Sequence, residues 1–216
     1  MKRLNVADLM CREVVTVNED TDFQEIADLL VSHAISAVPV VDSDGRVIGV
    51  VSEADLLGKL EYADRVPHHP LGARRVRSGR TGSVGNTAAD VMTSPPVTIR
   101  AEASVSGAAR LMDAARVKRL PVVGADDRLI GIISRRDLVR LYVRADADIA
   151  AALGTDLAGV GIDVSGVTLS VSRGVVTVAG TVEQEGLAEI IARFIAAVPG
   201  VVDVVNVVKI ADTSAA

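Results

Sequence analysis

The sequence predicts an α/β (α+β) protein made of two copies of one unit, related as a pseudo-twofold pair, and a smaller third unit. The residues from Val6 to about Leu57 recur 82 positions later with no shift in register, so that Asp55 corresponds to Asp137. Methionine, proline, glycine and serine positions recur as well: Met10 with Met92, Pro39 with Pro121, Gly49 with Gly131, and Ser52 with Ser134. Only two copies occur, which favours a closed pair because a solenoid needs at least three repeats.

Each copy has the pattern of a strand, a helix, two strands and a second helix. In the first copy, the β-branched run Val14–Val17 predicts a strand, and Thr21, with Gln24 three residues later, predicts a capped helix. The apolar runs Val38–Val41 and Val47–Val51 flank an Asp-Gly pair and therefore predict a hairpin. The second copy repeats this order through residues 97–99, 103–115, 120–123, 129–133 and 135–142.

The composition indicates a folded protein whose core is built from aliphatic side chains. Of the 216 residues, 49% are hydrophobic and only 2% are aromatic, which is enough apolar material for one or two domains. So few aromatic side chains leave little on which the bases of single-stranded nucleic acid could stack. The net charge of −5 also argues against a nucleic-acid partner.

The cysteine count and the first residues predict a cytoplasmic location. The single cysteine, Cys11, cannot form an internal disulfide, which suits a reducing compartment. The N-terminal residues lack the apolar stretch and cleavage site of a signal peptide, and the chain contains no run of about 18 apolar residues.

Three motifs in each copy resemble those of the CBS (cystathionine β-synthase) domain family. They are Val6–Met10, Ala37–Val41 and Gly49–Asp55 in the first copy, and Ala89–Thr93, Arg119–Val123 and Gly131–Asp137 in the second. The resemblance covers about residues 1–143. It implies a disc-like module that often forms a homodimer, with clefts between the repeats that bind adenosine-containing ligands.

Asp55 and Asp137 each fall in the first turn of the helix that ends a copy. A carboxylate accepts two hydrogen bonds at once, so either residue could hold the vicinal hydroxyls of a ribose. Ser52 and Ser134, three residues earlier, could bring a hydroxyl to the same sugar or to the first phosphate. The alternative is that all four residues only cap and charge the starts of their helices.

A basic pair just before the Leu-Pro of one repeat commonly reaches the ligand's phosphates in this family. Lys118 and Arg119 occupy that position here, whereas their counterparts Ser36 and Ala37 carry no charge. The resemblance therefore implies that these two cations and the Ser-Asp pair of the first copy form the better nucleotide site.

The remaining candidates have two interpretations each. An adenine ring would need an apolar slot, for which both copies offer lining residues that could equally belong to the core: Val15, Thr16, Val38, Pro39, Val97, Thr98, Leu120 and Pro121. Arg135 and Arg136 either add positive charge to the second cleft or form a solvated helix face.

Residues 61–86 are rich in arginine and glycine and predict a basic, flexible loop. The loop is either an electrostatic lure for anions, nucleic acid or an acidic partner, or a solvated tether between the copies. The predicted organisation is therefore a first repeat at 1–60, this loop, a second repeat at 87–143, and a third unit at 146–210.

The third unit contains β-branched strands around a helix and resembles a BON (bacterial OsmY and nodulation) domain. The resemblance rests on Arg173–Val182, Pro199–Val201 and Val204–Asn206. It implies phospholipid or ligand binding, but the scattered basic residues form no anionic-lipid patch. The unit could instead be an accessory domain that binds a protein partner or a second copy of the chain, since its strand edges need covering.

The sequence contains no phosphate loop, metal-ligand cluster or nucleophile constellation, so we expect a regulatory protein without a cofactor and not an enzyme. The first hypothesis is a sensor in which AMP, ADP, ATP or S-adenosylmethionine bridges the repeats and shifts their arrangement. The alternative is a constitutive scaffold or stress protein with empty clefts, whose third unit binds a partner or a membrane.

Overall fold

A computed structural model describes residues 4–58, 86–160, 166–182, 184 and 186–211. The chain forms two compact units, one over Asn5–Ser134 and the other from Arg135 onward. The mixture of helices and strands confirms the predicted fold class. The predicted basic loop at 61–86 lies outside the described residues, apart from Asn86.

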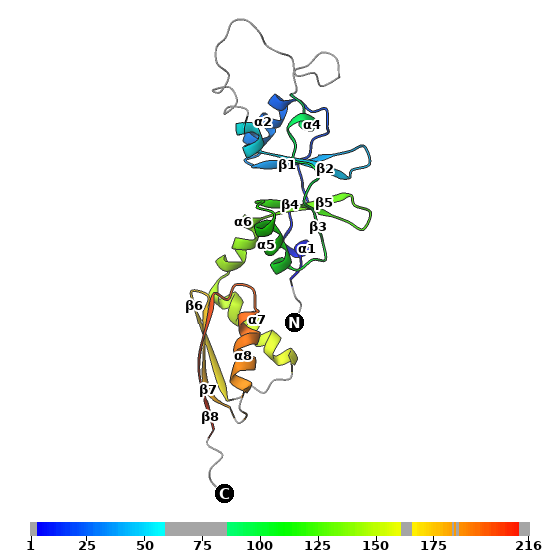
Figure 1. Ribbon diagram of the computed structural model, residues 1–216. Coiled ribbons are helices and arrows are strands. Elements are labelled where there is room, and N and C mark those ends of the chain that lie inside the picture. The colour runs from blue at the N-terminus through cyan, green and yellow to red at the C-terminus, as the bar shows by residue number, and fades with distance from the viewer. Residues whose placement is uncertain (1–3, 59–85, 161–165, 183, 185, 212–216) are drawn as a thin grey trace, which may run out of the picture. The chain divides into compact units, whose positions relative to one another are not determined.

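The first unit contains the two repeats, each with a hairpin covered by short helices (Figure 1). The elements of the first repeat are α1 (Val6–Leu9), α2 (Phe23–Ser32), β1 (Ala37–Val41), β2 (Val47–Ser52) and a helical segment at 53–58. Those of the second are α4 (Ala88–Val91), β3 (Ile99–Arg100), α5 (Val105–Ala114), β4 (Arg119–Val123) and β5 (Leu129–Ser134). The strands form one sheet of order β1-β2 and another of order β3-β4-β5.

The two hairpins have the same irregularities at equivalent positions. Both antiparallel pairs shift register one residue before the end of their first strand, between Val40 and Val41 and between Val122 and Val123. The first turn contains Gly45 at φ +80°, and the second replaces this glycine with Asp127 at φ +63°. Aspartate tolerates the left-handed region better than most residues, so the turn keeps its shape without the Asp-Gly pair.

Two local predictions in the first repeat were wrong. Of Val14–Val17, only Val17 pairs, in an isolated parallel bridge with Val40, because a single contact with the edge of β1 does not extend into a ladder. The N-cap of α2 is Asp22 and not Thr21. Thr21 is buried, and its hydroxyl accepts a hydrogen bond from the Asn18 N–H at 3.1 Å, so it stabilises the preceding turn instead.

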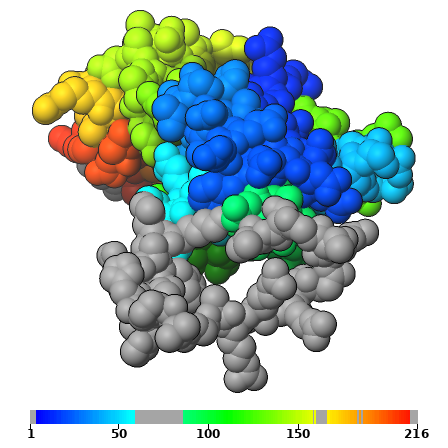
Figure 2. Space-filling model, turned by 90° about the horizontal axis from the view of Figure 1, so that it is seen from above, coloured from blue at the N-terminus to red at the C-terminus, as the bar shows by residue number. Residues whose placement is uncertain are grey.

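The first segment of each repeat packs against the other repeat and pairs with its backbone. The N–H of Val6 donates to the Ala103 carbonyl at 2.9 Å, and Cys11 forms an antiparallel bridge with Ile132. The first segment of the second repeat makes the equivalent contacts with the first repeat. The Ala88 N–H donates to the Thr21 carbonyl at 2.8 Å, and Thr93 and Val50 exchange two backbone hydrogen bonds of 2.9 and 3.2 Å. The two hairpin turns also meet through a bridge between Arg46 and Arg128, and they lie side by side in Figure 2.

The recurrence of methionine and glycine at equivalent positions of the two repeats has a physical reason, because each methionine packs on the other repeat's hairpin. A Cβ added to Gly49 would collide with the Met92 side chain. A Cβ added to Gly131 would lie 2.6 Å from Met10 Sδ and 3.0 Å from the Cys11 carbonyl oxygen. Glycine at both positions therefore allows the exchanged segments to approach the strands.

Replacing Gly131 with alanine is expected to lower the free energy of unfolding of the first unit by about 1–3 kcal/mol, because the backbone of residue 11 must move. Denaturant unfolding would measure the change. Gly58→Ala is the matched control, since nothing lies within 4 Å of the added Cβ there. Equal losses of stability in the two variants would contradict this explanation.

The second unit is a three-stranded sheet with helices on one face (Figure 1). It begins with α6 (Arg135–Val139) and the 3-10 helix η1 (Arg140–Val143), followed by α7 (Asp146–Val160), β6 (Val167–Ser172), β7 (Val175–Val182), α8 (Leu187–Ala196) and β8 (Asp203–Ile210). β6 pairs with β7 antiparallel, and β7 pairs with β8 parallel. A helix was expected over 135–142, but its second half tightens into η1.

The core of the second unit lies between the helices and the sheet. Ile149 and Leu153 of α7 and Ile191 of α8 are almost completely buried against Val176 and Val178 of β7. The segment before α7 also belongs to this unit, because the Arg144 guanidinium donates to the Pro199 carbonyl at 2.7 Å. None of the described helices has both the length and the apolar character needed to span a membrane.

Candidate functional site

The first repeat holds Asp55 in a fixed position at the start of the helical segment 53–58. Oδ2 of Asp55 accepts hydrogen bonds from the Ser52 N–H at 2.8 Å and from the Ser52 hydroxyl at 2.6 Å. The serine at the end of β2 therefore donates its hydroxyl to the carboxylate. Both side chains are half-buried, so the carboxylate is oriented while part of it still faces solvent.

Thr93 of the second repeat also contacts this carboxylate, which the sequence did not predict. Its hydroxyl donates to Asp55 Oδ1 at 3.4 Å. The contact exists because the exchanged segment pairs Thr93 with Val50, two residues before Ser52. The position equivalent to Thr93 in the first copy is Cys11, so the repeat pattern gave no signal for a hydroxyl here.

Arg119 lies beside the same helix start. Its guanidinium donates to the Ala37 carbonyl at 3.1 Å and to the Ser36 hydroxyl. Ala37 is the cross-strand partner of Ser52, and the Ser36 carbonyl accepts from the N–H of Glu53 at 3.0 Å. A cation of the second repeat is thus fixed next to the Ser52–Asp55 pair, whereas Lys118 is exposed.

The predicted apolar lining residues are divided between the core and the surface. Val38 and Pro39 of β1 and Leu120 and Pro121 of β4 are buried, as expected for the core interpretation of these residues. The remaining four flank the strands and are half-buried or exposed: Val15, Thr16, Val97 and Thr98.

The two residues of the second Ser-Asp pair belong to different units, Ser134 to the first and Asp137 to the second. Ser134 ends β5 and pairs with Arg119 across the hairpin. Asp137 lies in α6 and forms an ion pair with Arg140 at 3.8 Å, one helical turn further on. The residue equivalent to Arg140 in the first copy is Gly58, so this ion pair has no counterpart at Asp55. Arg135 and Arg136 are both exposed.

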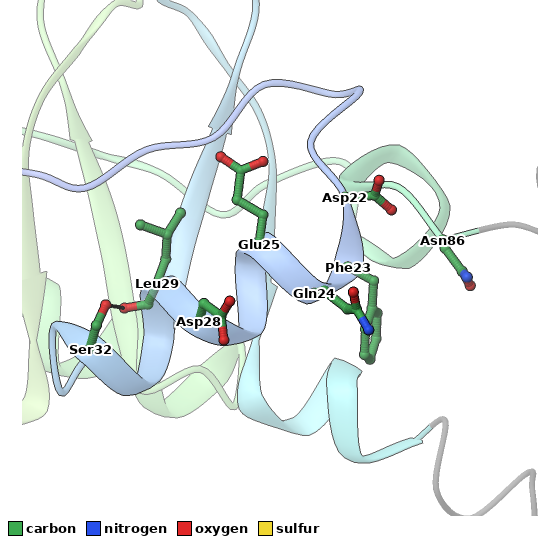
Figure 3. A pocket seen from close by; sticks show the side chains of 8 residues that line it. All are labelled: Asp22, Phe23, Gln24, Glu25, Asp28, Leu29, Ser32 and Asn86. Carbon is green, nitrogen blue, oxygen red and sulfur yellow. Dashed lines mark hydrogen bonds between the residues drawn. The ribbon is translucent and has the colours of Figure 1, made fainter.

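A pocket of about 750 Å³ occurs elsewhere in the first repeat, at the start of α2 (Figure 3). It contains none of the predicted site residues. Three of its lining residues are acidic, namely Asp22, Glu25 and Asp28, and the others are Phe23, Gln24, Leu29, Ser32 and Asn86. Acidic walls disfavour a phosphate, so the Ser52–Asp55 region fits a nucleotide better. Among the described residues, no group of three or more histidine, cysteine or acidic side chains could hold a metal ion.

Comparisons with known proteins agree with this architecture. A model of the CBS domain matches residues 6–62 and 88–144, and a model of the BON domain matches residues 145–212. A CBS domain-containing protein of Dictyostelium discoideum is 33% identical over 140 residues, which is 64% of this chain and 91% of that protein. The chain spans only 36%, 56% and 61% of the length of three other curated relatives.

Solved structures match the CBS pair. CBSX2, from Arabidopsis thaliana, was solved in complex with AMP and is 29% identical, with a TM-score of 0.51 and coverage of 64% of this chain and 96% of that one. The CBS pair of protein MJ0100, in complex with 5′-methylthioadenosine and S-adenosyl-L-methionine, is 22% identical with a TM-score of 0.53, covers 65% and 97% of the two chains, and supports the fold alone. The chain therefore belongs to the CBS-domain family and carries a BON domain after its pair of CBS repeats.

Proposed function

We propose that this protein is a regulatory sensor whose CBS pair binds an adenosine-containing ligand at Asp55. The observation that carries the proposal is the fixed carboxylate of Asp55, held by Ser52 and Thr93 with the Arg119 guanidinium at the adjoining strand. A ribose diol presents two hydroxyl donors, and an oriented carboxylate can accept both. The AMP complex of CBSX2, a relative in this fold, supports this ligand class.

Arg119 supplies the positive charge that a phosphate requires. A guanidinium has five N–H donors, and the bonds to Ala37 and Ser36 leave it pointing at the start of β1 beside Ser52. A ligand whose ribose lies on Asp55 would place its first phosphate towards this cation. Binding would then join residues of both repeats, and a ligand that prefers one arrangement of the repeats shifts the population towards it.

The direct test is calorimetric titration of AMP, ATP and S-adenosylmethionine into the full chain at fixed salt. We expect at least one of these ligands to bind, with AMP first among them. If the folded protein binds none of the three, the sensor proposal is wrong, and the result favours the alternative of a scaffold whose BON domain binds a partner or a membrane. Circular dichroism on the same samples shows that the protein is folded.

Replacing Arg119 with alanine is expected to weaken AMP binding by roughly tenfold and to change adenosine binding much less, because adenosine has no phosphate. Arg128→Ala is the matched control, since that arginine is exposed, its side chain pairs with Asp126 of the same turn, and its backbone bridge to Arg46 does not depend on the side chain. Calorimetry with both ligands measures the difference. Equal losses for AMP and adenosine would show that Arg119 supports the fold of the site and does not contact the phosphate.

A further inference from the structure

The strand β8 forms one edge of the sheet in the second unit, and its outer side has no partner strand among the described residues. The Ala211 N–H donates to the Val182 carbonyl at 2.8 Å, which shows that odd-numbered residues of β8 turn their backbone groups towards β7. The even-numbered residues Val204, Asn206 and Val208 therefore direct theirs to the open edge. Two of these N–H groups have side-chain acceptors on the same strand. The Val204 N–H donates to Asp203 Oδ1 at 2.8 Å, and the Val208 N–H donates to Asn206 Oδ1 at 3.2 Å.

The two faces of β8 differ. Val204 and Val208 pack against the core below the helices, and the Asn206 amide donates to the Ala188 carbonyl of α8 at 3.2 Å. The odd-numbered residues lie on the opposite face of the sheet, which α7 and α8 do not cover (Figure 1). On this face the valines Val205 and Val207 are 42% and 52% exposed.

The sequence of β8 is complementary to itself when two copies run antiparallel about Asn206. This arrangement places Asp203 opposite Lys209, Val205 opposite Val207 and Val202 opposite Ile210. Opposite charges meet at both ends, and the exposed side chains of Val202 and Ile210, at 59% and 55%, meet each other. A shift by two residues in either direction removes both ion pairs, so the charges specify one register.

The backbone parity agrees with this register. The even-numbered residues that face the open edge would form the hydrogen-bonded pairs, Val204 with Val208 and Asn206 with its own copy. In this pairing the N–H groups of Val204 and Val208 exchange their side-chain acceptors for carbonyls of the second copy. The odd-numbered pairs would then be non-hydrogen-bonded, and in such pairs the Cα atoms approach to about 4.5 Å and the side chains interact most closely. The complementary charges and the exposed valines occupy these positions.

We propose that β8 is a docking edge for a second copy of this chain, which pairs with it antiparallel about Asn206 and joins the two sheets into one. The occupant follows from the match of charge with charge and of apolar with apolar side chains across a twofold axis. An eight-residue edge strand without proline or a bulge is otherwise exposed to nonspecific pairing, and a specific partner removes that hazard. This inference is independent of ligand binding by the CBS pair.

Cysteine cross-linking tests the register in the full chain. Val205→Cys and Val207→Cys are made separately in a Cys11→Ser background, because Cys11 is exposed. An equimolar mixture is expected to form a disulfide-linked dimer under mild oxidation. Each variant alone is expected to cross-link at least about fivefold less, since identical positions lie diagonally, roughly 7–8 Å apart, beyond the reach of a disulfide. No dimer in the mixture, or equal cross-linking of single variants, would overturn the proposal.

Charge reversal tests the proposed partner through the same cross-linked yield, because the reversed charges lie at the proposed contact. Asp203→Lys or Lys209→Asp in both members of the mixture replaces two attractive pairs with two repulsive ones and is expected to weaken association by about tenfold or more. The double variant Asp203→Lys/Lys209→Asp restores opposite charges and is expected to recover the yield. The proposal fails if the single reversals have no effect, or if the double variant cross-links as poorly as they do.

Discussion

Replacing Asp55 with alanine is expected to weaken AMP binding by about 1.5–3 kcal/mol, or roughly 10- to 150-fold in the dissociation constant. The proposed ribose site depends on a carboxylate that three donors hold in place: the Ser52 N–H, the Ser52 hydroxyl and the Thr93 hydroxyl. Alanine removes the carboxylate that would accept the hydroxyl groups of the ribose. Calorimetric titration of the full chain at fixed salt measures the loss.

Two further variants make this result specific. Asp44→Ala is the matched control, because Asp44 is an exposed carboxylate of the β1–β2 turn that pairs with Arg46. Asp137→Ala reports on the second Ser-Asp pair and shows whether one site or two are occupied. If AMP binds Asp55→Ala and the wild-type chain equally well, Asp55 is not part of the ligand site.

Replacing Gly180 with alanine is expected to lower the free energy of unfolding of the second unit by about 3 kcal/mol or more. Gly180 adopts φ +135°, a conformation that residues with a Cβ rarely reach. An added Cβ would also collide with the backbone of Gly166 and lie 3.0 Å from Val167 Cα. Backbone atoms in a paired strand cannot move aside as a flexible side chain can, so both costs remain.

Gly154→Ala in α7 is the matched control, with the same substitution and the opposite expected sign. Gly154 is exposed in the middle of the helix, and nothing lies within 4 Å of the added Cβ. Alanine there should stabilise the unit by about 0.5–1 kcal/mol, because it restricts the unfolded chain and favours the helix. Denaturant melts of both variants, followed by circular dichroism, would contradict this reasoning if Gly180→Ala were as stable as the wild type.

The sequence predicted the parts of this fold that depend on short-range patterns. The repeat spacing, the two hairpins and the placement of Ser52 three residues before Asp55 all follow from local residue order and are present in the structure. The strand at Val14–Val17 and the cap at Thr21 were not predicted correctly, because a short β-branched run and a threonine are each compatible with several local structures.

The contacts that complete the candidate site could not be predicted from local order. Thr93 reaches Asp55 across 38 positions of sequence, and Arg119 reaches Ser36 and Ala37 across more than 80. Both contacts depend on how the two repeats fit together, which the repeat pattern itself does not encode. The resemblance to the family supplied Arg119 as a candidate, but no residue pattern identified Thr93.

Because the two repeats exchange their first segments, one repeat alone lacks the segment that packs on its hairpin. Each repeat contributes a segment, such as Val6–Cys11, that packs on the other repeat's hairpin at its glycine, and its own hairpin is covered in the same way. A chain with only one copy could make both contacts only by pairing with a second molecule of itself, so the tandem protein corresponds to a homodimer whose two subunits are joined in one chain. The two halves of the tandem chain can also differ from each other, and threonine stands at position 93 where cysteine stands at position 11.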